Sequence, residues 1–230
     1  LKRLKDTGMR KLCTLSVCLI CLGGGGAWGE VPTQLTGLTG DGSAADPFQI
    51  SSRAELEQVA AYFNETPVET VQYYYFKQMG PVDLQLMSWT PIGGMDTDIN
   101  PEAGKRFVGY YDGNGMAITG LTVDATGFAG GPNNIGLFGR VGEGTASQPV
   151  VIRDVHLMDV GVVRGGSGTG ALVGRVTGNV YTLIEGCSVE TARDAWGDPT
   201  GRVEGTRVTG GLVGANNSFA SSPGSDEIPV

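Results

Sequence analysis

The tetrapeptide Gly136-Leu137-Phe138-Gly139 returns twice more in this chain of 230 residues. The later copies are Ala171-Leu172-Val173-Gly174 and Gly211-Leu212-Val213-Gly214, and the three leucines are 35 and 40 residues apart. A period of this length is typical of stacked repeats, in which each unit buries its apolar residues against its neighbours. We therefore predict a solenoid in which Leu137, Leu172 and Leu212 form one column. Such a stack has a long lateral surface, which more often binds ligands than catalyses reactions.

A second apolar pattern supports the same period. Its copies begin at Ile118, Ile152 and Ile184, and in each copy apolar residues follow three and five positions later. The distances from these isoleucines to the next motif leucine are 19, 20 and 28 residues, so the third interval carries eight extra residues. We expect the extra residues at 192–200, where Asp198 precedes a proline and marks a loop. Insertions of this kind map to the rim of a solenoid.

The fold class that these patterns predict is all-β, a parallel β-solenoid. Residues two apart on a strand face the same side, so Val155 and Leu157 are expected to point inward and Asp154 and His156 outward. The same alternation places Cys187 inside the stack. The alternative is an antiparallel sandwich or barrel with glycine-rich hairpins, and the long repeat favours the solenoid.

One helix is predicted, near the beginning of the solenoid. A short strand at residues 48–50 precedes Ser52, which forms a capping box with Glu55. The apolar residues that follow share one helix face: Leu56, Val59, Ala60 and Phe63. We expect this helix to cover the apolar end of the first coil, which would otherwise invite edge pairing.

Strand-prone segments follow the helix at residues 73–76, 82–84 and 89–93. The first, Tyr-Tyr-Tyr-Phe, fits two interpretations: a platform on which a sugar stacks, or a strand whose alternate aromatics are buried and exposed. We prefer the second because successive side chains of a strand alternate in direction. Residues 96–104 are expected to be a polar excursion.

A glycine-rich reversal divides the strand-prone stretches on either side of residues 112–115, Asp-Gly-Asn-Gly. Asn and Gly tolerate the positive φ of tight turns, so we predict strand, turn, strand. The same residues faintly resemble the start of a calcium loop. A calcium loop would need more oxygen ligands than this stretch supplies, so the turn is preferred.

Residues 1–29 have the pattern of a secretory signal peptide. Five Lys or Arg residues precede an apolar run at 12–22, and Ala27-Trp28-Gly29 predicts cleavage after Gly29. The run is shorter than the about 20 residues of a spanning helix, although a membrane anchor is the alternative. Cleavage leaves 11 basic and 23 acidic residues, a net charge of −12, and the single cysteine Cys187. This charge argues against nucleic-acid binding, and one cysteine excludes an intrachain disulfide.

Taken in order, the motifs resemble those of the bacterial GLUG-motif surface proteins. The resemblance rests on residues 112–123 (Asp-Gly-Asn-Gly-Met-Ala-Ile-Thr-Gly-Leu-Thr-Val), on the three tetrapeptides, and on the upstream segments 47–50, 82–84 and 89–93. It spans about residues 40–217. The GLUG motif also occurs beside IgA-specific metallopeptidase domains and in haemagglutinin-like adhesins. The resemblance implies an extracellular, right-handed parallel β-helix-like domain with a role in surface display or adhesion.

The chain departs from the family pattern in three respects. Residues 78–81 interrupt the passage from strand to the acidic segment, Ala171 replaces a motif glycine, and only three copies are present. The motif is structural, so no catalytic residue is carried over from the family.

The inventory of reactive side chains is small. His156 is the only histidine, so neither a His-Glu-x-x-His site nor a Ser-His-Asp triad is expected, and we predict an exposed strand residue. We assign no catalytic, cofactor-binding or metal-ligating residue and expect no cofactor. The enzymatic alternative is a polysaccharide lyase or glycoside hydrolase using Asp154, Asp159, Arg153 and Arg164 on one lateral face.

We divide the chain into a signal peptide (1–29), a leader loop (30–46), the solenoid (47–217) and a linker-like, truncated end (218–230). The predicted function is that of a non-enzymatic secreted or cell-surface module for adhesion, display or ligand binding, with a glycan or a host or surface protein as partner. A spacer attached to a peptidase encoded elsewhere is the other alternative. An uncapped last coil predicts either further repeats and a C-terminal domain in a longer protein, or oligomerisation by end pairing.

Overall fold

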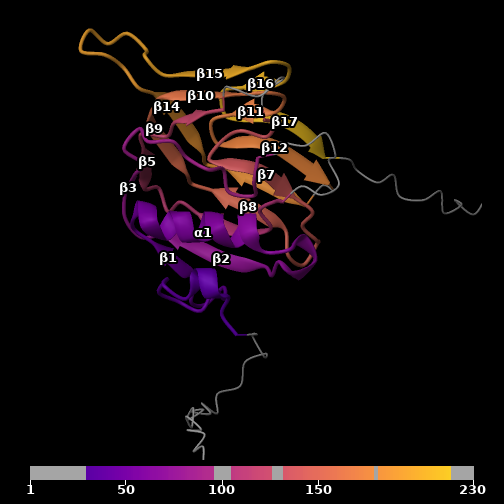
Figure 1. The fold of residues 1–230 in the computed structure, drawn as a ribbon. Coiled ribbons are helices and arrows are strands. Elements are labelled where there is room, and N and C mark those ends of the chain that lie inside the picture. Colours follow the sequence, from indigo (N-terminus) through magenta and orange to yellow (C-terminus); the bar gives the residue numbers. More distant parts are fainter. Residues whose placement is uncertain (1–29, 96–104, 126–131, 179–180, 219–230) are drawn as a thin grey trace, which may run out of the picture. The chain divides into compact units, whose positions relative to one another are not determined.

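Strands that lie far apart in the sequence pair side by side, and every pairing between them is parallel (Figure 1). This computed structural model describes residues 30–95, 105–125, 132–178 and 181–218. The predicted signal peptide, the polar excursion at 96–104 and all but the first residue of the linker-like end lie outside the described residues. The parallel pairing confirms a β-solenoid, and the sandwich or barrel alternative is wrong.

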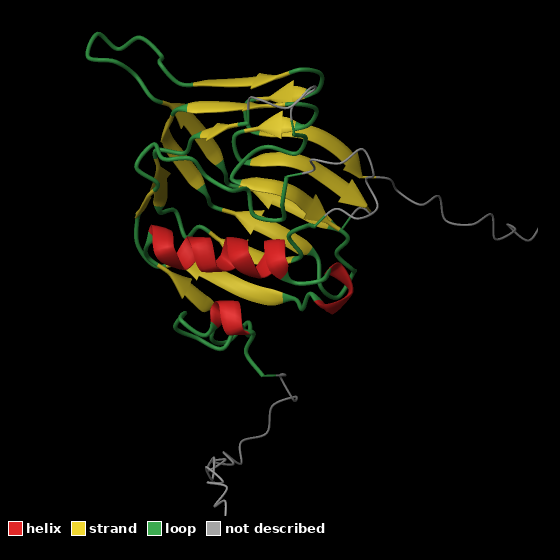
Figure 2. Ribbon diagram, in the orientation of Figure 1, coloured by secondary structure: helices red, strands yellow, loops and turns green. Residues whose placement is uncertain are grey.

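Five sheets run along the stack, and each takes its strands from successive coils (Figure 2). The largest sheet, sheet A, contains β1 (Phe48–Ile50), β2 (Tyr74–Gln78), β4 (Gly109–Asp112), β8 (Val150–Arg153) and β13 (Thr182–Glu185). Sheet B contains β3 (Val82–Asp83), β5 (Ala117–Thr119), β9 (His156–Val160) and β14 (Ser188–Thr191). Sheet C contains β6 (Val123–Asp124), β10 (Val162–Gly165) and β15 (Arg202–Gly205). Sheet D pairs β11 (Thr169–Gly170) with β16 (Thr209–Gly210), and sheet E contains β7 (Phe138–Gly142), β12 (Val173–Gly178) and β17 (Val213–Ser218).

The stack has about four coils, which begin at β2, β4, β8 and β13 in turn. Apolar residues from the sheets meet in one interior cluster, and the inward positions of the second and third coils are fully buried. Val155 and Leu157 have no exposed surface, whereas the side chains on either side of Val155 are partly exposed. This alternation confirms the predicted inward and outward positions.

The three motif leucines form the predicted column. The amide of Phe138 donates to the carbonyl of Leu172 (2.8 Å), and the amide of Leu172 donates to the carbonyl of Leu212 (3.0 Å). In each copy the leucine stands in a bend and the following residue begins a strand of sheet E. Leu137 and Phe138 are both fully buried, so the pair of apolar residues marks a corner whose two side chains enter the core.

The chain passes the same corner once more, one coil before the first recognised copy. Ile92 lies opposite Phe138, its amide donates to the carbonyl of Leu137 (3.0 Å), and its carbonyl accepts from Gly139 (2.8 Å). The stretch Trp89 to Gly93 is therefore a fourth rung under the tetrapeptide column. The tetrapeptide pattern does not reveal this rung, because Pro91 occupies the position of the leucine.

The register of the second apolar pattern is partly wrong. Ile152 lies opposite Ile184, as predicted, but Tyr111 occupies that column in the preceding coil. Ile118 instead lies opposite Leu157 in sheet B. The error has a physical cause: sheets A and B both alternate apolar and polar residues, so the same spacing fits two registers.

Residues 112–115 form the predicted tight turn. A carboxylate oxygen of Asp112 accepts from the amide of Asn114 (2.8 Å), and Met116 donates its amide to the carbonyl of Gly113 (2.9 Å). Asn114 and Gly115 have φ values of 54° and 67°, as the turn requires. The strands that it joins belong to sheets A and B, so it is a corner of the coil and no hairpin forms.

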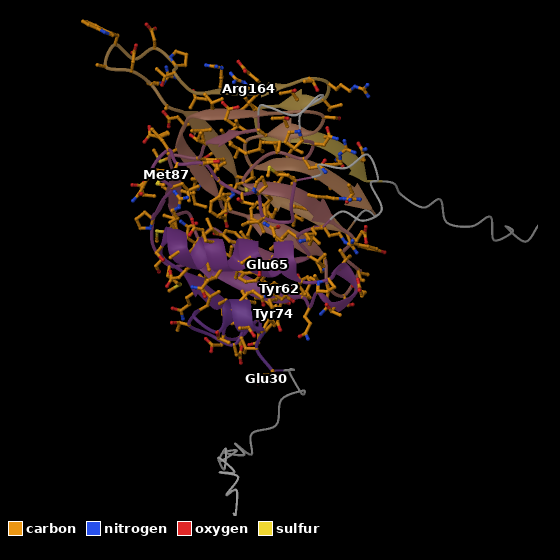
Figure 3. The ribbon with its side chains drawn as sticks, viewed as in Figure 1. Glu30, Tyr62, Glu65, Tyr74, Met87 and Arg164 are labelled. Carbon is orange, nitrogen blue, oxygen red and sulfur yellow. The ribbon has the colours of Figure 1, made fainter. Side chains whose placement is uncertain are left out.

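The predicted helix is α1 (Arg53–Glu65), and it begins at the predicted cap. The Ser52 hydroxyl accepts from the amide of Glu55 (3.3 Å), while the Glu55 carboxylate accepts from the amide of Ser51 (2.7 Å). The buried face consists of Leu56, Val59, Ala60, Tyr62 and Phe63. Tyr62 meets Tyr74 of the first coil, with ring centroids 5.7 Å apart (Figure 3). Two short 3-10 helices, Thr33–Leu35 and Val68–Thr70, lie before and after α1.

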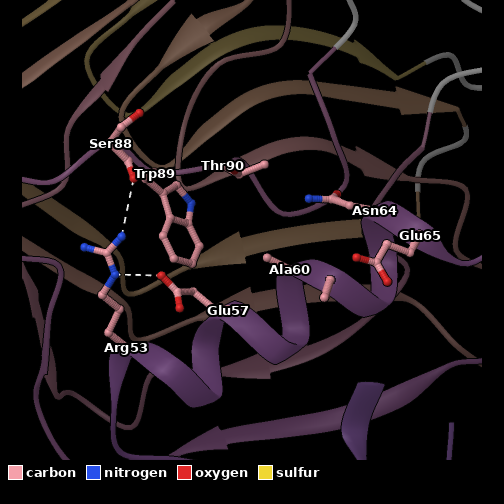
Figure 4. A pocket seen from close by; sticks show the side chains of 9 residues that line it. Arg53, Glu57, Ala60, Asn64, Glu65, Ser88, Trp89 and Thr90 are labelled. Atoms are coloured by element: carbon pink, nitrogen blue, oxygen red, sulfur yellow. Dashed lines mark hydrogen bonds and ion pairs between the residues drawn. The ribbon is translucent and has the colours of Figure 1, made fainter. Parts of the chain in front are cut away.

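Polar side chains of α1 bind the backbone at the open edge of the first coil (Figure 4). Arg53 donates to the carbonyls of Leu84 (2.7 Å) and Ser88 (3.4 Å), and Asn64 donates to the carbonyl of Pro91 (3.0 Å). A cavity of about 300 Å³ remains between the helix and residues 88–90. The helix thus covers both the apolar end and the edge carbonyls of the first coil, which confirms its capping role. In the described part of the chain no helix has the length and apolar content needed to cross a membrane.

Candidate functional site

The outer surface of sheet A carries two rows of side chains that run along the stack. Strand register places Tyr75, Tyr110, Val151 and Leu183 in one row, which we call the apolar ladder. The adjacent row is Gln49, Lys77, Asp112, Arg153 and Glu185, which we call the charged ladder. Each row forms because coils stack in register, so residues 28 to 41 positions apart become neighbours on one face.

Aromatic rings gather at the N-terminal end of the apolar ladder. The rings of Tyr75 and Tyr110 lie 5.3 Å apart at an angle of 32°, and Tyr73 contacts Tyr75 edge to face at 5.4 Å. Tyr73 also donates to the carbonyl of Pro149 (2.7 Å), and burial raises the pKa of its hydroxyl. Tyr74, between them, is 2% exposed. The predicted alternation is therefore confirmed, and it leaves three half-buried tyrosines together on the outside.

A cavity of about 580 Å³ lies beside the ring pair. Its walls are the loop 44–47 and residues of both ladders, Tyr75 and Tyr110 of the apolar ladder and Gln49, Lys77 and Asp112 of the charged ladder. Phe76 and Met79 complete the lining. The loop is held by the amides of Asp41 and Gly42, which donate to the carbonyl of Asp46 (3.0 Å each). Hydrogen bonds from Ser43 lower the pKa of the Asp41 carboxyl, because they stabilise its ionised form. The cavity thus joins aromatic surface to a few fixed polar groups, as ligand sites commonly do.

Acidic and basic groups alternate along the charged ladder. Lys77, Asp112, Arg153 and Glu185 come from four successive coils. Arg153 lies 3.9 Å from Glu185 and 2.8 Å from Asp154, and hydrogen bonds to Tyr110 and Asp154 raise the pKa of its guanidinium. The two acidic and two basic groups of this row compensate one another, so the row carries no net excess of either charge.

The eight extra residues of the last coil form a small hairpin at the rim, as predicted. Arg193 pairs with Pro199 in antiparallel fashion, and a carboxylate oxygen of Asp194 accepts from the amides of Trp196 and Asp198 (2.9 Å each). The side chain at its tip, Trp196, is 89% exposed. An indole displayed on a hydrogen-bonded turn is a second candidate contact for a ligand.

The four residues of the enzymatic alternative do not share a face, which corrects that expectation. Arg153 belongs to sheet A, Asp159 to sheet B and Arg164 to sheet C, where it pairs with Asp124 (3.3 Å) and Glu204 (2.6 Å). Asp154 and Asp159 each have a φ of 50°. Asp154 stands in the bend between β8 and β9, and Asp159 lies within β9, where the pairing with β14 shifts its register. Asp tolerates this conformation better than most residues, which accounts for both acids structurally.

His156 lies on the outer face of sheet B, where Nδ1 is 2.7 Å from the Ser188 hydroxyl of the next coil. It is an outward strand residue, as predicted, but it is half-buried and not fully exposed. Cys187 faces the interior of the last coil, and burial raises the pKa of its thiol. Searching the described residues for three or more His, Cys, Asp or Glu side chains that could hold a metal ion yields no such group.

Two features of the site had not been predicted: the contact of Tyr110 with Tyr75, and the exposure of Trp196. A signal for the first was present, because Tyr75 and Tyr110 are 35 residues apart, the same interval that separates Leu137 and Leu172. When outward residues repeat at the same interval as the buried motif residues, they are expected to become neighbours on the surface of successive coils.

Comparison with known proteins gives distant likenesses. No family model matches the chain. The chain is 33% identical over 158 residues to the "Putative Gly-rich membrane protein" of Evansella cellulosilytica, which covers 66% of this chain and 15% of that protein. It is 27% identical over 195 residues to halomucin of Haloquadratum walsbyi, covering 83% of this chain and 2% of halomucin. Both relatives are thus far longer than the part that this chain matches.

A solved structure with some likeness is that of a "putative immunoglobulin A1 protease" from Bacteroides ovatus. The sequences are 15% identical, the TM-score is 0.39, and the match covers 77% of this chain and 64% of that one.

Proposed function

We propose that this chain is a non-enzymatic secreted or cell-surface repeat module that binds an uncharged glycan through the outer face of sheet A. The observation that carries the proposal is the pair Tyr75 and Tyr110, whose rings lie 5.3 Å apart beside a cavity of about 580 Å³. Aromatic faces offer apolar surface at small entropic cost, and the C–H faces of sugar rings match them. Adhesion, display or attachment at a cell surface would follow from binding of this kind.

The polar groups around the rings support a sugar as the ligand. Lys77 and Asp112 line the cavity together with the amide of Gln49, so donors and acceptors for hydroxyl groups stand at the edge of the aromatic surface. The alternating charges of the charged ladder favour a neutral ligand over an acidic one. The extended lateral face offers room for several sugar units in a row.

The test is retention of the protein on an array of neutral glycans, acidic glycans and matrix proteins, followed by calorimetry with the retained glycan. We expect retention on neutral glycans, and a loss of at least about tenfold in affinity in the double variant Tyr75→Ala/Tyr110→Ala. Both side chains point outward, so thermal unfolding of the variant should stay close to that of the unchanged chain.

The variant that separates the two candidate contacts is Trp196→Ala, which removes the exposed aromatic side chain of the rim hairpin and leaves sheet A intact. Its affinity should be unchanged. Retention that depends on Trp196 and not on the tyrosine pair would move the site to the hairpin. Release of new reducing ends would support the enzymatic alternative, and absence of retention on every surface would support a spacer.

A further inference from the structure

The last coil, formed by β13 to β17, presents an uncovered apolar end. Its inward residues are only partly buried, although the residues under them in the third coil have no exposed surface at all. The pairs are Ile184 over Ile152, Cys187 over Val155, Val189 over Leu157, Val203 over Val163, Leu212 over Leu172 and Val213 over Val173. The end of the stack is therefore built like an internal rung that lacks a neighbour.

Backbone groups are uncovered at the same end. Each of the five strands of the last coil stands at the edge of its sheet, so on one side it has no neighbouring strand among the described residues. The other end differs, because α1 covers it with apolar side chains and with Arg53 and Asn64. Two copies therefore cannot stack head to tail. Only the two open ends can meet, which gives a closed pair with two-fold symmetry.

Strand β15 carries charges that suit such a pairing. Its sequence is Arg202-Val203-Glu204-Gly205, and it forms the outer edge of sheet C. A two-fold axis at Val203 would place Arg202 of one copy opposite Glu204 of the other, and Glu204 opposite Arg202. Within one copy Arg202 and Glu204 already pair with each other (2.5 Å), so an antiparallel copy would exchange this ion pair across the axis.

The backbone of β15 is oriented for the same register. The amide of Arg202 donates to the carbonyl of Gly161 on the inner side (3.0 Å). Because successive residues of a strand point their amide and carbonyl groups to opposite sides, those of Val203 face the open end. In an antiparallel pair centred on Val203, each copy would donate to and accept from the other at this residue.

From these observations we propose that a second copy of this chain covers the open end, and that the two copies join β15 to β15 about a two-fold axis at Val203. The inward residues of the two last coils would then bury one another, and the two outer faces of sheet A would belong to one bivalent particle. The proposal does not depend on the identity of the ligand that sheet A binds.

The test uses charge reversal and mixing. Arg202→Glu gives a strand with two acidic residues and Glu204→Arg gives one with two basic residues, so each variant alone should repel its own copy. Sedimentation or light scattering should show the unchanged chain at twice the mass of the monomer and each variant as a monomer. An equal mixture of the two variants should regain the dimer, because opposite charges then face each other across the axis.

Arg207→Glu is the control, since it makes the same charge change on an exposed residue of the last coil outside β15. It should remain a dimer. A second measurement uses Val203→Cys, because residues in a hydrogen-bonded antiparallel pair have Cα atoms about 5.5 Å apart, within the range of a disulfide. Mild oxidation should yield a peptide crosslinked at position 203 to itself. A monomeric unchanged chain, or a dimer that neither charge reversal disturbs, would overturn the proposal.

Discussion

Gly174 is the motif residue whose replacement best tests how closely the coils approach. A Cβ added there would lie 2.5 Å from the carbonyl carbon of Asn134 and from the amide nitrogen of Ile135, and 2.7 Å from the carbonyl oxygen of Gly139. All three atoms belong to the backbone of the preceding coil. They cannot rotate away as a side chain would, so the coils themselves must separate.

The magnitude follows from these distances. Carbon atoms reach their best contact at about 3.5–4.0 Å, so the Gly174→Ala variant requires a local shift of about 1 Å in a paired backbone. Overpacking of a well-packed core costs about 1–3 kcal/mol and occasionally more. Because the three contacts come from both sides of the corner, we expect a loss near the upper end, about 3 kcal/mol. That is a large share of the about 5–15 kcal/mol that stabilises a typical domain.

Gly211 provides the matched control from the same motif. A Cβ at this position would have no atom within 4 Å, and its φ lies outside the left-handed region. Ala171 already occupies the equivalent place one coil earlier. Gly211→Ala should therefore be neutral or stabilise the fold by about 0.4–1 kcal/mol, because alanine restricts the unfolded chain more than glycine does.

Urea denaturation followed by circular dichroism measures both variants. The midpoint of Gly174→Ala should fall clearly below that of the unchanged chain at a similar slope, while the midpoint of Gly211→Ala stays the same or rises. Equal effects of the two substitutions, or a Gly174→Ala variant as stable as the original, would refute the reasoning from close approach between coils.

Three further predictions concern stability. Leu172→Ala should cost about 3 kcal/mol and Leu212→Ala about half as much in urea denaturation, because Leu172 is fully buried between two rungs and Leu212 is half-buried at the open end. Tyr111→Phe should raise the unfolding midpoint by an amount equivalent to about 1 kcal/mol, since the buried Tyr111 hydroxyl has no hydrogen-bond partner among the described residues. Burial raises the pKa of Tyr62 to about 12, above its unfolded value near 10, so the unfolded state loses its proton first. The stability due to the neutral Tyr62 is thus complete below about pH 10 and declines as pH rises toward 12. Urea midpoints measured at about pH 8 and about pH 11 would detect this decline. An unchanged midpoint at the higher pH would contradict the prediction.

The parts of the fold that sequence predicted correctly are those with a local physical signal. The Ser52 and Glu55 pair marks a helix start wherever an apolar face follows, and α1 begins there. The leucine column was predictable because a corner that buries two apolar side chains tolerates few residues, so Leu recurs at Leu137, Leu172 and Leu212.

The errors of register have a common origin in the unequal lengths of the coils. Ile118 was assigned to the column of Ile152, because strands on sheets A and B share one alternating pattern and only the coil length distinguishes them. The rung at Ile92 was missed for this reason too, in addition to the Pro91 that stands in the position of the leucine. Its distance from Phe138 includes the stretches 96–104 and 126–131, and no local signal gives the length of such an insertion.

The candidate site was less predictable than the fold, because its members come from different coils. The alternation of the tyrosines at 73–75 follows from the strand period, yet the partner of Tyr75 on the surface is set by the register between coils. The enzymatic grouping of Arg153 with Arg164 failed because the chain turns twice between them, at Asp154 from sheet A to sheet B and at Gly161 from sheet B to sheet C.

Function in a fold of this kind resides in the residues that do not repeat. The inward positions repeat because every coil must offer the next one the same apolar surface, so the motifs report the stacking and carry little information about ligands. The outward positions are free of that constraint. On sheet A they change from Lys77 to Asp112 to Arg153 to Glu185 in successive coils, and this sequence of side chains gives the face its chemistry. A correct register between coils is therefore the step that converts a repeat motif into a hypothesis about binding.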